Sequence, residues 1–207
     1  MQVHTVDEAL TTAKTLAAGP GRRLLGLVGE PGAGKSTLAA RIAEQLPGRA
    51  VVVPMDGFHL AQAELERLGR ASRKGAPDTF DAWGFLALVR RLAEPDESVV
   101  YAPQYHRELH NPVAGAIAVP QHCPLVIVEG NYLLNSGQPW QQLRALFDEV
   151  WFLDLGHSAR IDRLIARHIR TGKSEQAARE WSLGPDERNA EVIRAGAELA
   201  DAVVQMG

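Results

Sequence analysis

The sequence has little of several features that mark common classes of protein. It contains one cysteine, Cys123, so no disulfide can form within the chain, and a reducing compartment suits it. Apolar runs such as residues 125–128 are far shorter than the roughly 20 residues that a membrane helix needs. Asp7 and Glu8 stand where an export signal would carry positive charge and then an apolar stretch. We therefore predict a cytoplasmic protein that contacts no membrane.

An excess of charge of one sign is also missing. The 22 lysines and arginines and the 25 aspartates and glutamates are well mixed, and the formal net charge is −3. Because no basic stripe is present, no nucleic-acid partner is predicted. The 207 residues are enough for one domain with a full hydrophobic core, and we predict a single domain over residues 1–207. The sequence leaves the oligomeric state open, a homodimer included.

What the sequence does contain is a glycine-rich segment between an expected strand and an expected helix. Residues 24–28 predict a buried strand, and residues 36–46 have helical period with Leu38, Ile42 and Leu46 on one side. The segment between them matches G-x-x-x-x-G-K-[ST]. Its glycines let backbone N–H groups face an anion, and the helix N-terminus adds positive potential. The predicted phosphate-binding residues are Gly29, Glu30, Pro31, Gly32, Ala33, Gly34, Lys35, Ser36 and Thr37.

This motif also predicts the cofactors. Lys35 is placed to reach the β- and γ-phosphates of ATP, and the hydroxyl of Ser36 to ligate Mg²⁺. The alternative is a glycine turn that only connects two core elements, but a Gly-Lys-Ser sequence has no packing reason there. We therefore predict ATP and Mg²⁺ as cofactors and Lys35 as a catalytic residue.

The rest of the chain alternates between buried strands and helices. Further strands are expected at residues 50–55, 125–128, 150–154 and 202–204, and helices after a capping box at Thr5–Glu8 and at residues 81–94, 158–171 and 174–196. Residues 99–101 and 116–119 could pair as a long hairpin around a polar tip from Gln104 to Pro112. This order predicts the α/β three-layer sandwich of a P-loop NTPase, with a mostly parallel, doubly wound sheet.

Three acids follow the ends of expected strands. Such sheets bind ligands at the carboxyl ends of their strands, so Asp56, Glu129 and Asp154 should lie near the phosphate loop. An ordinary aspartate pKa near ~3.9 makes Asp56 a weak base, so we expect it to orient the acceptor hydroxyl and take the proton late. Glu129 is predicted to hold the metal together with Ser36, although the roles of Asp56 and Glu129 could be exchanged. Asp154 is expected to be structural.

The first late helix carries four arginines on one stripe. Arg160, Arg163, Arg167 and Arg170 are spaced by three, four and three residues, with apolar residues on the other side. The stripe could be a solvated surface. In a phosphoryl-transfer protein it would instead form an arginine-bearing helical lid, here predicted over residues 157–186, and Arg163 and Arg167 are predicted to be catalytic.

Two polar segments could bind the phosphoryl acceptor. The first spans residues 73–81, and the second lies in the predicted hairpin over residues 98–119. The candidate substrate-binding residues are His59, Arg73, Lys74, Asp81, Tyr105, His106 and Arg107.

Taken together, these segments resemble the phosphoribulokinase, uridine kinase and pantothenate kinase family of P-loop kinases. The resemblance spans most of the chain from Leu24 to about Asn189. It rests on Gly29–Thr37, Met55–His59, Arg73–Asp81, Tyr101–Arg107, Val128–Gly130 and Arg163–His168. It implies that Asp56 is the catalytic base and that Arg163 and Arg167 belong to the lid.

Within this family the acceptor stays open. Arg73-Lys74-Gly75 is similar to pantothenate kinases and residues 77–81 to uridine kinases, but neither acceptor signature is complete. The long hairpin tip and residues 181–190 resemble a bacterial subgroup labelled nucleoside or nucleotide kinase-like or fructose-transport-associated kinases.

The sequence thus predicts a kinase that phosphorylates a hydroxyl of a small molecule, such as a sugar like fructose, a nucleoside or a pantothenate-like compound. One alternative is a nucleotide-binding switch or assembly NTPase that acts through a protein partner. The guanine signature N-K-x-D is missing, and such a switch does not need the inserted hairpin. A nucleotide-binding protein without catalysis is a third reading, which the strand-end acids disfavour.

Overall fold

The structure, a computed structural model, describes residues 2–106 and 108–207. Its main sheet has six strands in the order β1-β8-β7-β2-β6-β3, and every neighbouring pair is parallel. These strands are β1 (Gln2–Thr5), β2 (Arg23–Gly29), β3 (Ala50–Pro54), β6 (Leu125–Glu129), β7 (Glu149–Asp154) and β8 (Ala202–Gln205). The predicted parallel sheet is confirmed, while β1, at its edge, was not foreseen from the sequence.

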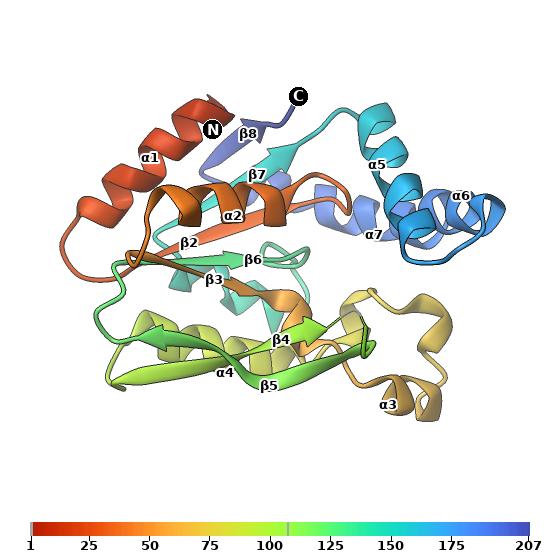
Figure 1. Ribbon diagram of the computed structural model, residues 1–207, viewed down its shortest axis with the longest axis horizontal. Helices are drawn as coiled ribbons and strands as arrows, with labels where there is room; N and C mark the ends of the chain where they lie inside the picture. The colour runs from red at the N-terminus through yellow and green to blue at the C-terminus, as the bar shows by residue number, and fades with distance from the viewer. Residues whose placement is uncertain (1, 107) are drawn as a thin grey trace.

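Helices cover both faces of this sheet. Helices α1 (Val6–Ala18) and α2 (Lys35–Gln45) lie on one face, and α4 (Ala82–Ala93) lies on the other (Figure 1). The capping box that opens α1 is present, with the side chain of Thr5 accepting from the backbone of Glu8. The three layers confirm the predicted α/β sandwich of a P-loop fold.

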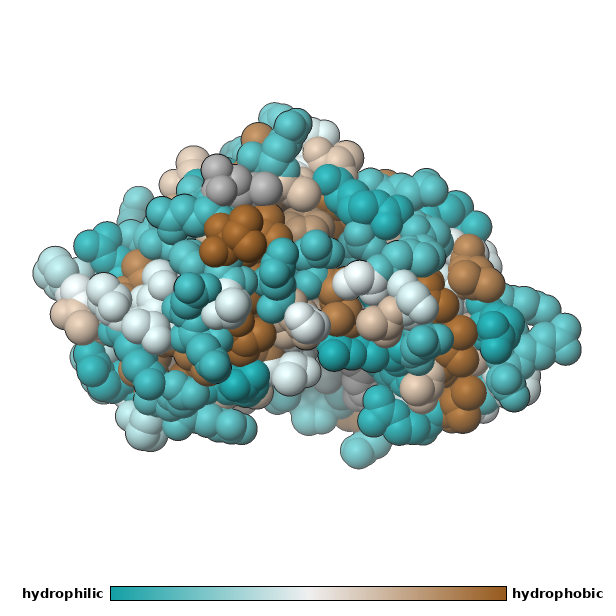
Figure 2. All heavy atoms as spheres, turned by 90° about the horizontal axis from the view of Figure 1, so that it is seen from above, coloured by the Kyte–Doolittle hydropathy of each residue, from teal (hydrophilic) through white to brown (hydrophobic). Residues whose placement is uncertain are grey.

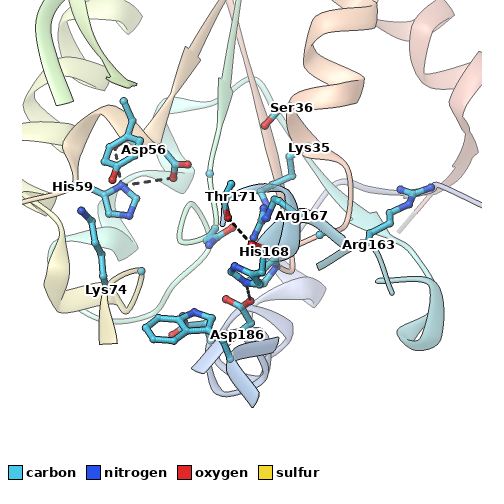
Figure 3. Close-up of a pocket in the computed structure, with 18 of the residues that line it drawn as sticks. Lys35, Ser36, Asp56, His59, Lys74, Arg163, Arg167, His168, Thr171 and Asp186 are labelled. Carbon is cyan, nitrogen blue, oxygen red and sulfur yellow. Dashed lines mark hydrogen bonds and ion pairs between the residues drawn. The ribbon is translucent and has the colours of Figure 1, made fainter. Parts of the chain in front are cut away.

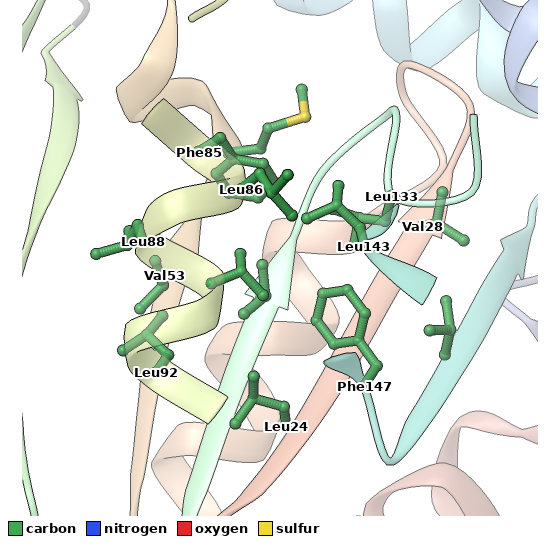
Figure 4. Packing of buried hydrophobic residues seen from close by; sticks show 14 of the residues in the cluster. Leu24, Val28, Val53, Phe85, Leu86, Leu88, Leu92, Leu133, Leu143 and Phe147 are labelled. Carbon is green, nitrogen blue, oxygen red and sulfur yellow. The ribbon is translucent and has the colours of Figure 1, made fainter. Parts of the chain in front are cut away.

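The alternation of side chains along the strands explains why the sheet is buried on both faces. Leu24 and Val28 of β2 pack into the cluster beneath α4, whereas Leu25 and Leu27 pack against α1 and α2. Figure 4 shows Leu24 and Val28 with residues of α4 such as Phe85, which is fully buried. The central strands are therefore apolar at almost every position, as the sequence suggested.

The predicted hairpin forms a second, two-stranded sheet. Strands β4 (Val99–His106) and β5 (Asn111–Pro120) are antiparallel. The polar tip is shorter than predicted, because Tyr105 pairs with Pro112 and His106 with Asn111. Strand pairing thus continues into a polar segment that composition alone marked as a loop. Arg107 lies outside the described residues.

The remaining helices gather beyond the carboxyl ends of the main strands. Helices α5 (His157–Arg170), α6 (Glu175–Leu183), α7 (Pro185–Arg194) and the short α3 (Gln62–Arg67) lie at the same end of the molecule as the turn between β2 and α2 (Figure 1). The expected single helix over residues 174–196 was wrong, because Pro185 begins a new helix after Gly184. Short 3₁₀ segments occur at Met55–Phe58, Ala71–Arg73, Pro77–Thr79, Trp140–Gln142, Arg144–Leu146 and Ala197–Leu199.

Polar residues dominate the surface seen in Figure 2, where hydrophobic residues occur in patches interrupted by polar ones. Among the described residues, no helix combines the length and the apolar character that a bilayer crossing requires.

Candidate functional site

The glycine-rich segment forms a tight turn between β2 and α2. Gly32 and Gly34 have φ values of 86° and 100°, and Gly34 is the N-cap of α2. These left-handed conformations are unfavourable for other residues, which explains the glycines. The N–H of Ala33 donates to the carbonyl of Glu30 at 3.0 Å and closes the turn. The loop therefore has the backbone conformation that the motif predicts.

Lys35 folds back over this loop. Its Nζ donates to the carbonyl oxygens of Gly29 at 2.7 Å and of Glu30 at 3.1 Å. Burial lowers the pKa of Lys35 to about 8, while the carboxylates of Glu129 and Asp56 act in the opposite direction. Hydrogen bonds to carbonyl oxygens thus hold this ammonium at the loop mouth, a position suited to pairing with an anion.

A carboxylate on the neighbouring strand meets the loop serine. Strands β2 and β6 pair with Leu27 opposite Glu129, which brings the end of β6 beside the loop. The hydroxyl of Ser36 donates to Glu129 Oε1 at 2.9 Å, and Glu129 is buried. A hydroxyl and a carboxylate at this spacing are oxygen ligands of the kind that Mg²⁺ prefers.

Asp56 lies across the cavity from the loop, in the 3₁₀ turn after β3, beside His59 (Figure 3). His59 Nδ1 is 2.9 Å from the carbonyl oxygen of Asp56 and 3.9 Å from its Oδ1. The His59 ring packs beside two aromatic rings: its centre is 4.1 Å from the ring centre of Phe80 and 5.0 Å from that of Tyr105. The Asp56 side chain is half-exposed, so its carboxylate is open to a ligand.

The turn that carries Asp56 is pressed against the hairpin. A Cβ on Gly57 would collide with the carbonyl oxygen of Pro103 in β4, whose backbone cannot yield easily. We expect Gly57→Ala to lower the unfolding free energy by about 1–3 kcal/mol in urea denaturation. Gly207→Ala, where a Cβ meets only an ordinary contact, is the control and should change it by less than about 0.5 kcal/mol. An unchanged Gly57→Ala would show that the hairpin moves freely.

These groups line one cavity of about 960 Å³. From the loop the lining includes Pro31, Gly32, Gly34, Lys35, Ser36 and Thr37, and from the other predicted residues it includes Asp56, His59, Lys74, Tyr105, Glu129, Arg163 and Arg167. Residues far apart in the sequence thus share one site. Arg163 Nη1 is 3.5 Å from where a Cβ on Gly34 would stand, so this arginine lies beside the phosphate loop.

Several predicted residues do not line the cavity. Arg73 makes two 2.5 Å hydrogen bonds to the carboxylate of Asp78, and Asp81 caps α4 by accepting from the N–H of Gly84. His106 neighbours the cavity residue Tyr105 along β4, and successive side chains of a strand point to opposite faces. The remaining predicted residues outside the lining are Gly29, Glu30 and Ala33.

The sequence reasoning missed one wall of the cavity. His168, Trp181, Asp186 and Asn189 line it from α5, α6 and α7. His168 Nε2 is 2.7 Å from Asp186 Oδ2, which ties α5 to α7 (Figure 3). Because these residues converge only when three helices pack together, no spacing in the sequence reveals them. The Gly184-Pro185 break was the available signal that the helices turn there.

Arg160 differs from the other arginines of the stripe that the sequence placed on one side of α5. Its side chain is 1% exposed, its Nε lies 2.6 Å from Glu30 Oε2, and its Nη2 contacts Glu187. Arg194 bridges the same two carboxylates, at 3.1 Å from Glu30 and 2.8 Å from Glu187. This cluster joins the phosphate loop to α5 and α7. Arg160 is thus a buried residue of an ionic cluster, and the side chain of the loop residue Glu30 is one of its ion-pair partners.

The ionic cluster should make stability depend on acid pH. Burial works to raise the pKa of Glu187, but hydrogen bonds from Arg194 and Arg160 outweigh it and the pKa is lowered. A lowered folded-state pKa gives stability that is present above the unfolded value near ~4.3 and is lost as pH falls below it. We expect the stability difference between the wild type and Glu187→Gln to shrink from pH 6 to pH 3, as measured by urea denaturation. A constant difference would contradict this role of Glu187.

A strand, a glycine-rich loop and a helix at the carboxyl edge of a parallel sheet, with an acid beside the loop serine, define a P-loop nucleotide-binding protein. Comparison with known proteins narrows this class. No family model matches the chain. The chain is 34% identical to "Putative uridine kinase C227.14" of Schizosaccharomyces pombe, over 98% of its length and 91% of that protein. It is 35% identical to "Uncharacterized protein YggC" of Escherichia coli, over 89% and 78% of the two chains.

Solved structures agree with this result. A structure titled "putative fructose transport system kinase" from Silicibacter sp. TM1040 is 38% identical, has a TM-score of 0.84 and covers 94% of this chain and 97% of its own. The structure of YFH7 from Saccharomyces cerevisiae, titled "a putative P-loop containing kinase with a circular permutation", is 19% identical with a TM-score of 0.81. It covers 97% of each chain and supports the fold alone. The chain belongs to the family of uridine kinase-like P-loop kinases.

Proposed function

We propose that the protein transfers the γ-phosphoryl group of ATP to a hydroxyl of a small molecule. The observation that carries this proposal is that the phosphate loop and the Asp56 carboxylate face one cavity from opposite sides. A volume of about 960 Å³ is at the upper end of ordinary ligand pockets. It therefore leaves room for an acceptor beside the triphosphate. A nucleotide switch would have no use for that second half of the cavity.

In this proposal each group has a separate task. The loop amides and Lys35 hold the β- and γ-phosphates, and Arg163 and Arg167 neutralise the charge that spreads over the transferred group. Asp56 accepts a hydrogen bond from the acceptor hydroxyl, aims its oxygen at the γ-phosphorus and takes the proton as the new bond forms. Their placement around one cavity supports these roles, because phosphoryl transfer depends mainly on positioning and electrostatics.

Ser36 and Glu129 are the residues proposed to hold Mg²⁺. Their oxygen atoms lie 2.9 Å apart at the loop, and both are ligand types that this ion accepts. The ion would neutralise phosphate charge when bound. The contact between Ser36 and Glu129 supports a metal role for Glu129 and leaves Asp56, across the cavity, for the acceptor.

We further propose that the protein acts in the cytoplasm on a small-molecule acceptor. Its single cysteine, Cys123, is free and buried in the structure, which suits a reducing compartment. A homodimer stays an untested prediction.

The proposal is tested by measuring ADP release from ATP and Mg²⁺ with a panel of sugars, nucleosides and small hydroxy acids. We expect release that depends on one class of acceptor and stops when the divalent cation is chelated. Tight ATP binding without turnover on any acceptor would favour a non-catalytic role, and acceptor-independent hydrolysis that a protein partner controls would favour a switch.

A further inference from the structure

Lys74 stands in the acceptor half of the cavity on a well-fixed loop. The side chain is half-buried, and Figure 3 shows it on the same side as His59 and Asp56, away from Lys35 and Ser36. The next residue, Gly75, is tied on both sides: its N–H donates to Thr79 Oγ1 at 3.0 Å, and its carbonyl accepts from the hydroxyl of Tyr132 at 2.6 Å. Both partners are fully buried. The backbone that presents Lys74 is therefore rigid.

Among the described residues, the ammonium of Lys74 contacts neutral groups. Its Nζ donates to the carbonyl of His110 at 3.0 Å, lies 3.4 Å from Gln62 Oε1 and sits 5.2 Å from the ring centre of Tyr105. Within residues 2–106 and 108–207 no carboxylate oxygen comes within 4.0 Å of it. In the part of the chain that the structure describes, Lys74 is thus a half-buried cation without an ion-pair partner.

Two other cations of the same loop are paired with a carboxylate. Arg70 and Arg73 of the same loop both pair with Asp78, so their charges are neutralised. Four carboxylates of the described residues line the cavity. Asp186 pairs with His168, Glu129 accepts from Ser36, and Asp56 lies 3.9 Å from His59. The fourth, Glu108, is exposed and is not within 4.0 Å of Lys74. An anion stabilises a partly desolvated ammonium, and an anionic ligand bound in the cavity can fill this role for Lys74.

We propose that Lys74 binds an anionic group of the acceptor, a carboxylate or a phosphate ester, while Asp56 orients the acceptor's hydroxyl. The acceptor is then a hydroxy acid or a phosphorylated polyol instead of a neutral sugar or nucleoside. Tyr105 lies beside Lys74 and His59 beside Tyr105, so in this proposal their rings pack against the carbon skeleton between the two ends of the acceptor. This inference rests on the proposed kinase activity.

The first test uses inorganic phosphate as the probe on the full-length protein. The protein is saturated with AMP-PNP and Mg²⁺, which fills the phosphate loop, and phosphate is then titrated by calorimetry. We expect phosphate to bind the wild-type complex and to bind Lys74→Gln at least about tenfold more weakly. Lys74→Arg keeps the charge and should retain binding. Lys14→Gln, the same change on an exposed lysine of α1, is the control and should bind as the wild type does. Acetate in place of phosphate distinguishes a carboxylate site from a phosphate site.

The second test compares acceptors that differ only in charge, such as D-glycerate with glycerol and fructose 6-phosphate with fructose. We expect the charged member to be preferred, and Lys74→Gln to raise its KM at least about tenfold while kcat changes less than about threefold. If AMP-PNP binds but phosphate and acetate do not, or bind Lys74→Gln equally well, the inference is overturned and the kinase proposal stands. If AMP-PNP itself does not bind, the proposed function fails and the inference fails with it.

Discussion

Replacing Asp56 with asparagine is expected to lower kcat for acceptor phosphorylation by about 10²–10⁴-fold, with little change in ATP affinity. Asparagine keeps the size of the side chain but cannot accept the hydroxyl proton as the bond to phosphorus forms. The side chain is half-exposed and asparagine has nearly the same shape, so folding should be unaffected. Steady-state kinetics with the best acceptor measures the change.

Asp154→Asn is the matched control, because Asp154 also ends a strand of the sheet but does not line the cavity. We expect its kcat to stay within about twofold of the wild type, as for a surface change away from the site. Full turnover in Asp56→Asn would remove this residue from the mechanism.

The Mg²⁺ dependence of the same variants separates the two acids. If Glu129 holds the metal, Glu129→Gln should raise the Mg²⁺ concentration needed for half-maximal activity at least about tenfold, as loss of a metal-binding partner commonly does. Asp56→Asn should leave it unchanged. The opposite result would exchange the roles of Asp56 and Glu129, which the sequence alone leaves open.

Replacing Arg160 with methionine is expected to lower the unfolding free energy by about 3–5 kcal/mol. The guanidinium is 1% exposed and contacts two carboxylates, so its loss leaves Glu30 and Glu187 partly desolvated, with Arg194 as their remaining ion-pair partner among the described residues. The methionine side chain fills some of the space of the arginine side chain. The loss of the positive charge is therefore the main cause of the expected change in unfolding free energy. Urea denaturation of the purified variant measures the effect.

Arg179→Met serves as the control, since Arg179 is exposed and pairs with Glu175 at 3.8 Å within one helix. Such a pair contributes less than about 1 kcal/mol. If Arg160→Met changes stability no more than Arg179→Met, the buried cluster does not hold α5 and α7 to the loop.

The sequence was most informative where a local pattern determines the local structure. The loop conformation follows from glycines at Gly32 and Gly34, and the position of Glu129 beside Ser36 follows from a fully apolar strand next to β2. Parallel strands end at one edge, so Asp56 could be placed near the loop without coordinates.

What could not be predicted depends on contacts between distant segments. Helical spacing put Arg160 on the same stripe as Arg163, but which arginine is buried depends on Glu187, 27 positions along the chain. Similarly, Arg73 and Lys74 are adjacent and both basic. Only the fold shows that Arg73 pairs with Asp78 whereas Lys74 lines the cavity. Strand alternation would have separated Tyr105 from His106, had the strand been expected to extend so far.

The pairing of β1 with β8 brings the first and last described strands side by side, with Gln2 opposite Ala202 and Thr5 opposite Gln205 (Figure 1). Both strands run in the same direction, so a peptide that returns from the end of β8 to the start of β1 has to cover only about 13 Å, the length of four strand residues. Closing so short a loop costs little chain entropy. The order of segments along the polypeptide is therefore separable from their arrangement in space, and a chain cut at an exposed turn and rejoined at this edge should reach the same native state.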